Sequence, residues 1–265
     1  MPDYLPPLDR LVAFGPVEFN EKWPDYVSIL GLTIEHVPEL IRMVGDPNLY
    51  DSDVENETCA TIHARRALGQ LRAVEAVGPL LETMDEYIDG DDFWTEELPE
   101  VLATIGPGSL PALAKWLAHS GADEATRNVC AEAIAQIGKK CPESRDECVE
   151  ILTNQLARHE DHQDAWVVNG FIVSALIDLD ATESALAIES AFLADVVDES
   201  IAGGWKSTRH QLGLGPTPVG SDIRPRWRLA RRLLPNPITQ RPNLKKLRAK
   251  LKSQKAAKKG KSNRR

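Results

Sequence analysis

The chain has 265 residues and a net charge of −9, and 42% of its residues are hydrophobic, which suffices to bury a sizeable core. No run of sequence approaches the roughly 18 apolar residues that a membrane-spanning helix needs, which argues against a membrane protein. The charge is unevenly distributed. Residues 223–265 hold 17 Lys and Arg and no acid, whereas residues 1–222 hold 14 basic and 40 acidic side chains, a net −26.

The N-terminal sequence and the cysteines both predict a cytoplasmic protein. The first ten residues, MPDYLPPLDR, are proline-rich and acidic, which fits neither a secretory signal nor a transit peptide. Cys59, Cys130, Cys141 and Cys148 form no C-x-x-C pair, so neither a zinc knuckle nor a thioredoxin-type motif is expected. We expect all four to be free thiols that pack as small hydrophobic side chains.

Residues 1–23 are expected to form an N-terminal extension, and helical patterns begin at residue 24. Residues 26–30 supply part of a first helix, and Thr33 is placed to cap a second helix over residues 34–44. A third helix is expected to open with the capping box Ser52-x-x-Glu55 and to run to Leu71 with apolar residues at helical spacing.

The pattern of a helix, a short break and a second apolar helix then recurs. A helix with an apolar stripe from Trp94 to Ile105 ends at Gly106-Pro107-Gly108 and is followed by Leu-Pro-Ala-Leu. Two further copies cover residues 131–156 and 174–192. The β-branched run at residues 167–173 lies within a helical stripe, so no strand is expected.

The recurrence predicts an all-α fold in which neighbouring hairpins stack. The steps between equivalent positions are 37 residues (Gly69 to Gly106), 32 residues (Gly106 to Gly138) and 42 residues (Ile137 to Leu179). Small residues in each first helix allow close packing, and each hairpin has an apolar face that it cannot bury alone. We therefore predict a right-handed α-solenoid, an α-α superhelix of about four to five hairpins over residues 24–200.

The segment ARRALGQLRAVEAVGPLLETM, residues 64–84, resembles the HEAT repeat, in particular the short variety of phycobilisome-lyase-like proteins. The resemblance covers roughly residues 24–200. It implies an armadillo-like solenoid, and such repeats serve as scaffolds, adaptors, lyase subunits and, in a few cases, enzymes. The chain also resembles bacterial HEAT-like proteins that end in a Cys-rich SEC-C metal motif, but no such motif occurs in this sequence.

The C-terminal part differs in character from the repeats. Residues 201–222 are rich in Gly without a helical period and are predicted to be a linker, and residues 223–265 a disordered basic tail. Residues 224–234, RPRWRLARRLL, have the pattern of a short basic amphipathic helix. A polybasic segment neutralises phosphates, and Trp227 is suited to stack on an unpaired base. The candidate polyanion-binding residues are Arg224, Arg226, Trp227, Arg228, Arg231, Arg232, Lys245, Lys246, Arg248, Lys250 and Lys252.

Three sequence patterns resemble functional sites, but a structural role explains each of them more simply. Residues 158–164, RHEDHQD, gather two His and three acids, but the His-Glu pair that iron-binding HEAT-type hydroxylases repeat occurs only once here. The acidic and aromatic residues 85–97 lie where carboxylates are solvated, and they suit a basic protein partner better than acid–base catalysis. A body at net −26 would repel the DNA that HEAT-like glycosylases bind.

The preferred function is therefore a non-catalytic scaffold or adaptor that holds another protein on its concave surface, with no catalytic residue, metal or cofactor. In solenoids of this type the second helix of each hairpin normally lines that surface. The candidate partner contacts are Glu75, Glu82, Trp94, Lys115, Glu150 and Gln155. One alternative is a protein that binds nucleic acid or the ribosome through the basic tail, and a second is a lyase-like enzyme or enzyme subunit. A third is that the basic tail and the acidic body neutralise each other, in cis or between copies.

Overall fold

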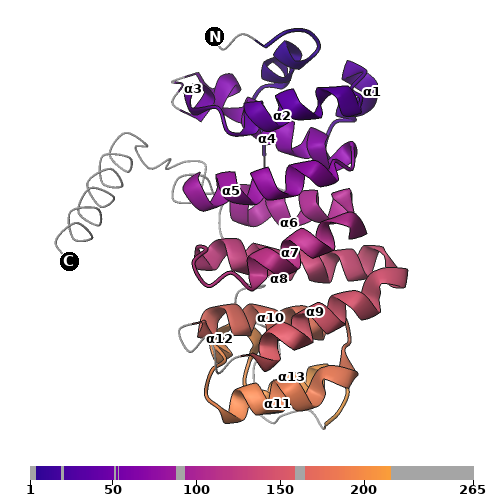
Figure 1. Cartoon of the computed structure of the whole chain (residues 1–265), viewed down its shortest axis with the longest axis vertical. Helices are drawn as coiled ribbons and strands as arrows, with labels where there is room; N and C mark the ends of the chain where they lie inside the picture. The colour runs from indigo at the N-terminus through magenta and orange to yellow at the C-terminus, as the bar shows by residue number, and fades with distance from the viewer. Residues whose placement is uncertain are drawn as a thin grey trace, which may run out of the picture.

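The computed structural model describes residues 4–18, 21–50, 52, 54–87, 93–158 and 165–215. Within these ranges the chain is helical and contains no strand, which confirms the predicted all-α class. None of the described helices is long and apolar enough to cross a membrane. The helices are stacked along one long axis, with the N-terminal residues at one end and residues 185–211 at the other (Figure 1).

Four long helices lie side by side and form a first layer. They are α4 (Glu55–Gln70), α6 (Phe93–Ile105), α8 (Glu124–Lys140) and α10 (Trp166–Asp178). Each packs extensively against the next one in this order. Helix α1 (Tyr26–Leu30) packs against α4 at the start of the layer, and α12 (Glu199–Ala202) packs against α10 at its end.

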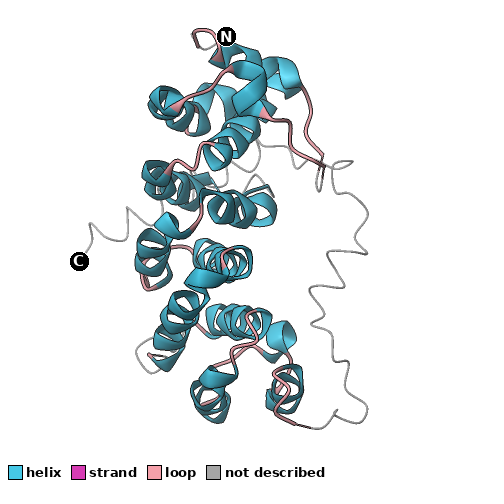
Figure 2. Cartoon of the chain, turned by 90° about the vertical axis from the view of Figure 1, so that its right-hand side faces the viewer, coloured by secondary structure: helices cyan, strands magenta, loops and turns pink. Residues whose placement is uncertain are grey.

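A second layer lies against the first, so that the helices form two columns in Figure 2. Its helices are α2 (Val37–Val44), α5 (Val77–Tyr87), α7 (Leu110–Leu117), α9 (Arg145–Ala157) and α11 (Ala185–Leu193). The short helix α3 (Pro47–Tyr50) packs against α4, and α13 (Trp205–Gln211) packs against α11.

Every second-layer helix is entered through the same kind of turn. A 3-10 turn of three residues directly precedes each helix: η2 (Ile34–His36), η3 (Val74–Ala76), η5 (Pro107–Ser109), η6 (Pro142–Ser144) and η8 (Thr182–Ser184). In each turn the N–H of the third residue donates to the carbonyl of the residue before the turn, over 2.9–3.1 Å. Thr33, the residue before the first turn, also forms the predicted cap, with its N–H donating to Nδ1 of His36 at 3.0 Å.

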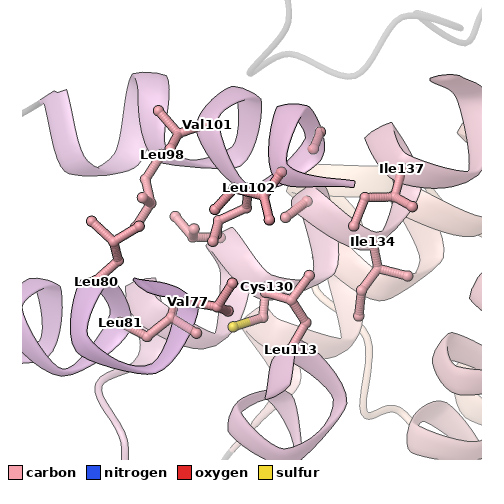
Figure 3. Close-up of a cluster of buried hydrophobic side chains, with 14 of the residues drawn as sticks. Val77, Leu80, Leu81, Leu98, Val101, Leu102, Leu113, Cys130, Ile134 and Ile137 are labelled. Atoms are coloured by element: carbon pink, nitrogen blue, oxygen red, sulfur yellow. The ribbon is translucent and has the colours of Figure 1, made fainter. Parts of the chain in front are cut away.

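One continuous apolar core runs between the two layers, from Tyr4 to Leu212. Figure 3 shows its middle part, where Leu80 and Leu81 of α5 and Leu113 of α7 meet side chains of α6 and α8. All three leucines are at most 1% exposed. Burial of a leucine side chain contributes roughly 1.5–3 kcal/mol, so the stacking of successive helices supplies most of the stability of this fold.

Two glycines allow the first-layer helices to approach closely, and for Gly69 the sequence predicts this role. A Cβ atom on Gly69 of α4 would lie 3.4 Å from the Val101 carbonyl oxygen of α6. A Cβ atom on Gly138 of α8 would lie 2.7 Å from Leu179, which follows α10. The Gly69 distance is already van der Waals contact, and a Cβ on Gly138 would require the Leu179 side chain to shift, so both glycines fit closely packed sites.

The helix ends agree with the predicted signals in one case and differ in another. Helix α6 ends at Ile105, and Gly106 follows with φ of 98°, a conformation that favours glycine. The predicted capping box of Ser52 and Glu55 is wrong. The Ser52 hydroxyl instead accepts the N–H of Val54 and donates to the carboxylate of Glu57, because α4 begins only at Glu55.

One of the predicted segments needs correction. In the N-terminal extension, η1 (Leu8–Phe14) packs on α4 with Leu8 and Leu11 buried. Residues 205–211 are not linker but helix α13, and the Trp205 indole N–H donates to Glu189 of α11 at 3.1 Å. The sequence shows no apolar helical period here because the buried face of α13 includes polar residues such as Thr208. Residues 216–222 lie outside the described residues.

A buried ion pair joins the N-terminal segment to the first layer. The Arg66 guanidinium of α4 is fully buried and donates from Nε to Glu97 of α6 at 2.8 Å, and its Nη1 donates to Glu21 at 2.8 Å. Burial alone would lower the pKa of Arg66, but its hydrogen bonds to the two carboxylates raise it. The guanidinium therefore stays charged and ties three parts of the chain together.

His63 makes a second polar connection beside this pair. Its Nε2–H donates to the carbonyl of Gly15 at 3.0 Å, and its Nδ1 accepts the hydroxyl proton of Tyr26 at 2.7 Å. Burial lowers the pKa of His63, with a further contribution from the Arg66 charge. Burial also raises the pKa of Tyr26 to about 12, so the hydroxyl remains protonated and can donate. The imidazole is thus held neutral in the folded chain.

Replacing one member of the buried ion pair should destabilise the protein strongly. Glu97→Gln leaves the Arg66 charge partly uncompensated in the interior, which we expect to cost about 3–5 kcal/mol of unfolding free energy. Urea denaturation followed by circular dichroism measures this cost. Lys140→Met breaks the exposed pair of Lys140 with Glu100 and is the control, with an expected cost of about 0–1 kcal/mol. Equal effects of the two variants would contradict the assigned role of Arg66.

The neutral state of His63 predicts a stability that falls in mild acid. A histidine with a lowered pKa in the folded state stabilises fully above its unfolded pKa of about 6.5, and this stabilisation is lost as the pH falls through the folded pKa. The unfolding free energy should therefore decrease between about pH 7 and pH 5. His63→Gln, which keeps polar atoms but does not titrate, should flatten this decrease. An unchanged pH profile in the variant would show that His63 is not its source.

Candidate interaction surfaces

The stack of helices is bowed, and the second layer lies on the outer side of the bow (Figure 2). The packing agrees with this curvature, because successive first-layer helices contact one another more extensively than successive second-layer helices do. We call the exposed face of the second layer the outer surface, and the exposed face of α6 and α8 that points away from it the inner surface. The expectation that the second helix of each hairpin lines the concave side therefore does not agree with this arrangement.

The structure separates the six predicted partner contacts into three groups. Glu75 of η3 and Glu82, Lys115 and Glu150 of α5, α7 and α9 are exposed, and all lie in the second layer. Gln155 of α9 is only 6% exposed. The prediction that Gln155 contacts a partner at the surface is therefore wrong.

Trp94 needs the same correction. Its side chain is 0% exposed because it is buried in the core, and the guanidinium of Arg65 lies 4.0 Å above its ring. The sequence shows an acidic and aromatic cluster around Trp94, but it does not show which of these rings points inward.

The outer surface is mainly acidic. Glu82 and Glu86 are exposed on α5, and Glu147 and Glu150 are exposed on α9. Between these two helices, Lys115 is the exposed cation of α7. Carboxylates on these positions are well solvated, and the surface has the charge that attracts basic polypeptides.

The inner surface is a narrow polar stripe on two otherwise buried helices. Helix α8 is covered by α6 and α10 at its sides and by α7 and α9 on one face, which leaves one stripe facing away from the second layer. The stripe consists of half-buried or exposed residues at helical spacing on α6 and α8: Glu96, Glu100, Thr104, Asn128, Glu132 and Gln136. Sequence reasoning missed this face, although polar residues every fourth position in apolar helices are its signal.

Two ion pairs connect neighbouring helices across the inner surface. Lys140 of α8 contacts the carboxylate of Glu100 on α6, and Lys139 of α8 lies 3.8 Å from Asp178 on α10. All four side chains remain partly exposed to solvent. Together with Glu96 and Glu132, this surface holds four carboxylates and two lysines, which gives it a net negative charge.

The same face of α4 is covered by an extended stretch of the chain itself. Residues 15–25 cross α4 without regular structure in their described part, and side chains of α4 bind this stretch. His63 binds the Gly15 carbonyl, and Gln70 donates to the Pro24 carbonyl at 2.8 Å and accepts the Tyr26 N–H at 2.9 Å. Arg66 binds the Glu21 carboxylate. This face of the first layer thus binds extended polypeptide through polar side chains.

Two carboxylates of the acidic and aromatic residues 85–97 have structural partners, and residues 88–92 lie outside the described residues. Asp85 accepts the backbone N–H of Asp123 at 2.7 Å and the hydroxyl of Thr126 at 3.2 Å, which ties α5 to the start of α8. The Glu97 carboxylate accepts a hydrogen bond from the Arg66 guanidinium. Among the described residues, no three His, Cys, Asp or Glu side chains converge as a metal site requires. His159 and His162 lie outside the described residues.

The thiols differ in exposure. Cys59, Cys130 and Cys148 are buried, and Cys141 is partly exposed at the end of α8. Burial raises the pKa of Cys130 well above its usual range and that of Cys148 to about 11. These two thiols are therefore protonated at neutral pH and are poor nucleophiles.

The predicted polyanion-binding residues, from Arg224 to Lys252, lie outside the described residues. Comparison of the chain with models of protein families finds no match, and no curated protein or solved structure is detectably similar to it. The resemblance to HEAT repeats therefore stays a prediction based on sequence pattern, and the surfaces are argued from the geometry of this chain alone.

The burial of the thiols predicts their reactivity. In the native protein, a thiol reagent such as dithionitrobenzoate should react rapidly with Cys141 and only slowly with the other three, because these require local opening. All four should react at once in denaturant. Cys141→Ser should abolish the rapid phase. Rapid reaction of a second thiol in the native protein would contradict the described packing.

Proposed function

We propose that the chain is an α-solenoid of HEAT-like hairpins that acts as a non-catalytic scaffold or adaptor. The five similar 3-10 turns, each leading into a second-layer helix, support a repeated hairpin unit. Small residues at the helix contacts, Gly69 and Gly138, support the stacking of these units. A solenoid presents extended surfaces rather than a deep pocket, which suits binding of another polypeptide.

The observation that carries the proposal is the binding of residues 15–25 on α4. An extended segment is held there through its backbone carbonyls and one carboxylate by side chains of a single helix. The inner surface continues this face onto α6 and α8, where no segment of the described chain covers it. We infer that an extended segment of a partner protein binds along α6 and α8, beside the N-terminal segment.

The charge of the inner surface indicates the chemistry of the partner. The surface and the two ion pairs beside it hold four carboxylates, Glu96, Glu100, Glu132 and Asp178, and two lysines, so their net charge is negative. A partner segment with Lys or Arg would meet these carboxylates at the rim while its backbone is bound by amide side chains such as Gln136. The partner is therefore expected to be basic.

Two matched double variants test this proposal. Glu96→Lys with Glu132→Lys alters the inner surface, and Glu82→Lys with Glu150→Lys makes the same charge change on the outer surface. A partner recovered from nuclease-treated native lysate by the full chain should bind the inner variant at least about tenfold more weakly, because repulsion replaces attraction at the rim. The outer variant should bind almost as the unaltered protein does. Loss of binding in the outer variant alone would move the site to the outer surface.

The charge asymmetry of the sequence favours one alternative, a protein that binds nucleic acid or the ribosome through residues 223–265. The 17 basic residues of this segment predict affinity for polyanions that falls steeply with salt. Nuclease treatment separates the two functions, because a partner that binds through RNA is lost from the full chain while one that binds the inner surface is retained.

A further inference from the structure

Helix α11, the last helix of the second layer, presents two leucines to solvent. Leu186 is 81% exposed and Leu193 is 83% exposed, which makes them the most exposed large apolar side chains among the described residues. They are seven residues apart, or about two helical turns, so they lie on one face of α11. Ser190 lies between them on that face. The last hairpin of a stacked array ordinarily has a polar outer face, and α11 does not.

The surroundings of this leucine face are acidic. No Lys or Arg occurs between Arg158 and Lys206. Asp180 and Asp195 are exposed before and after α11. Arg145, which reaches over from α9, is occupied by the carboxylate of Glu183 at 2.8 Å. A segment that covers the leucines would therefore gain from positive charge.

The chain itself continues from a point beside α11. Helix α13 packs on α11, with the ring centroid of Trp205 6.1 Å from that of Phe192, and the described residues end at Gly215, close to α13. The eight residues from Gly215 to Ile223 can span at most about 26–29 Å. That reach exceeds the length of α11, which is about 13 Å for its nine residues.

Residues 223–234, IRPRWRLARRLL, have a sequence pattern that complements this face. Ile223, Trp227, Ala230 and Leu234 recur at helical spacing and would share one face of a helix. The five arginines of the segment occupy other positions: Arg224, Arg226, Arg228, Arg231 and Arg232. The segment thus combines an apolar stripe with positive charge, and near α11 the six acids from Asp180 to Glu199 outnumber the exposed Lys206 and Arg209 of α13.

We propose that residues 223–234 bind in cis to the exposed face of α11. Trp227 and Leu234 cover Leu186 and Leu193, and the flanking arginines face Asp180 and Asp195. This contact closes the C-terminal end of the helical stack, and it lies at a distance from the inner surface proposed to bind a partner. The Lys-rich residues beyond 243 remain outside the contact.

Limited trypsin digestion of the full chain, followed by mass spectrometry, tests this contact. Cleavage after Arg226, Arg228 and Arg231 should be about tenfold slower than cleavage after Lys245 to Lys252, because proteolysis requires release of the segment. The Lys-rich residues serve as an internal reference in the same molecule. The double variant Leu186→Gln with Leu193→Gln should make the two rates equal.

Two controls keep this test specific. Ile29→Gln with Ile34→Gln changes two exposed apolar residues at the opposite end of the stack and should leave the protection in place. Trp227→Ala should remove the protection without altering α11. Equal cleavage rates in the unaltered chain, or protection that persists in the Leu186 and Leu193 variant, would overturn the proposal. Protection in a particle of twice the 29.3 kDa chain mass would also overturn it, because the segment of a second copy would then be the occupant.

Discussion

The fold depends on the close approach of the first-layer helices. Each of these helices has neighbours at both sides and the second layer on one face, so most of its circumference must be apolar or small. Gly69 and Gly138 stand where an added Cβ would meet a neighbouring helix or the residue that follows it. Close packing of this kind removes apolar surface from water along the whole stack, and it leaves each first-layer helix only one stripe for polar residues.

The N-terminal end of the stack meets the same constraint by other means. Helix α4 has no long first-layer helix before it, since α1 comprises only five residues. Helix α1 and η1 pack against α4 instead, and the described part of residues 15–25 covers the inner face of α4 as an extended stretch. An extended backbone carries carbonyl groups that need donors when buried, and His63, Arg66 and Gln70 supply polar contacts there. The buried Arg66 charge is tolerated because Glu97 and Glu21 surround it.

The surfaces that remain differ in chemistry because they have different neighbours. The outer surface is solvated and acidic, and it faces no other part of the described chain. The inner surface is narrower and continues a face that already binds polypeptide over α4. The exposed leucines of α11 terminate the stack and lie in a region without a basic residue from 159 to 205. The strongly basic residues 223–265 thus follow a stretch, residues 159–205, that contains acids but no Lys or Arg.

The sequence by itself determined the helical class and most helix positions, because apolar spacing and glycine or proline at helix ends are local signals. It predicted α1 and the end of α6 correctly. It failed where burial depends on distant partners. Trp94 is buried under Arg65, and α13 is held by Glu189, and neither contact is visible in local pattern. The curvature, which places the second layer outside, and the pairing of Arg66 with Glu97 across 31 residues were likewise decided only by the tertiary structure, because both arise from packing between helices.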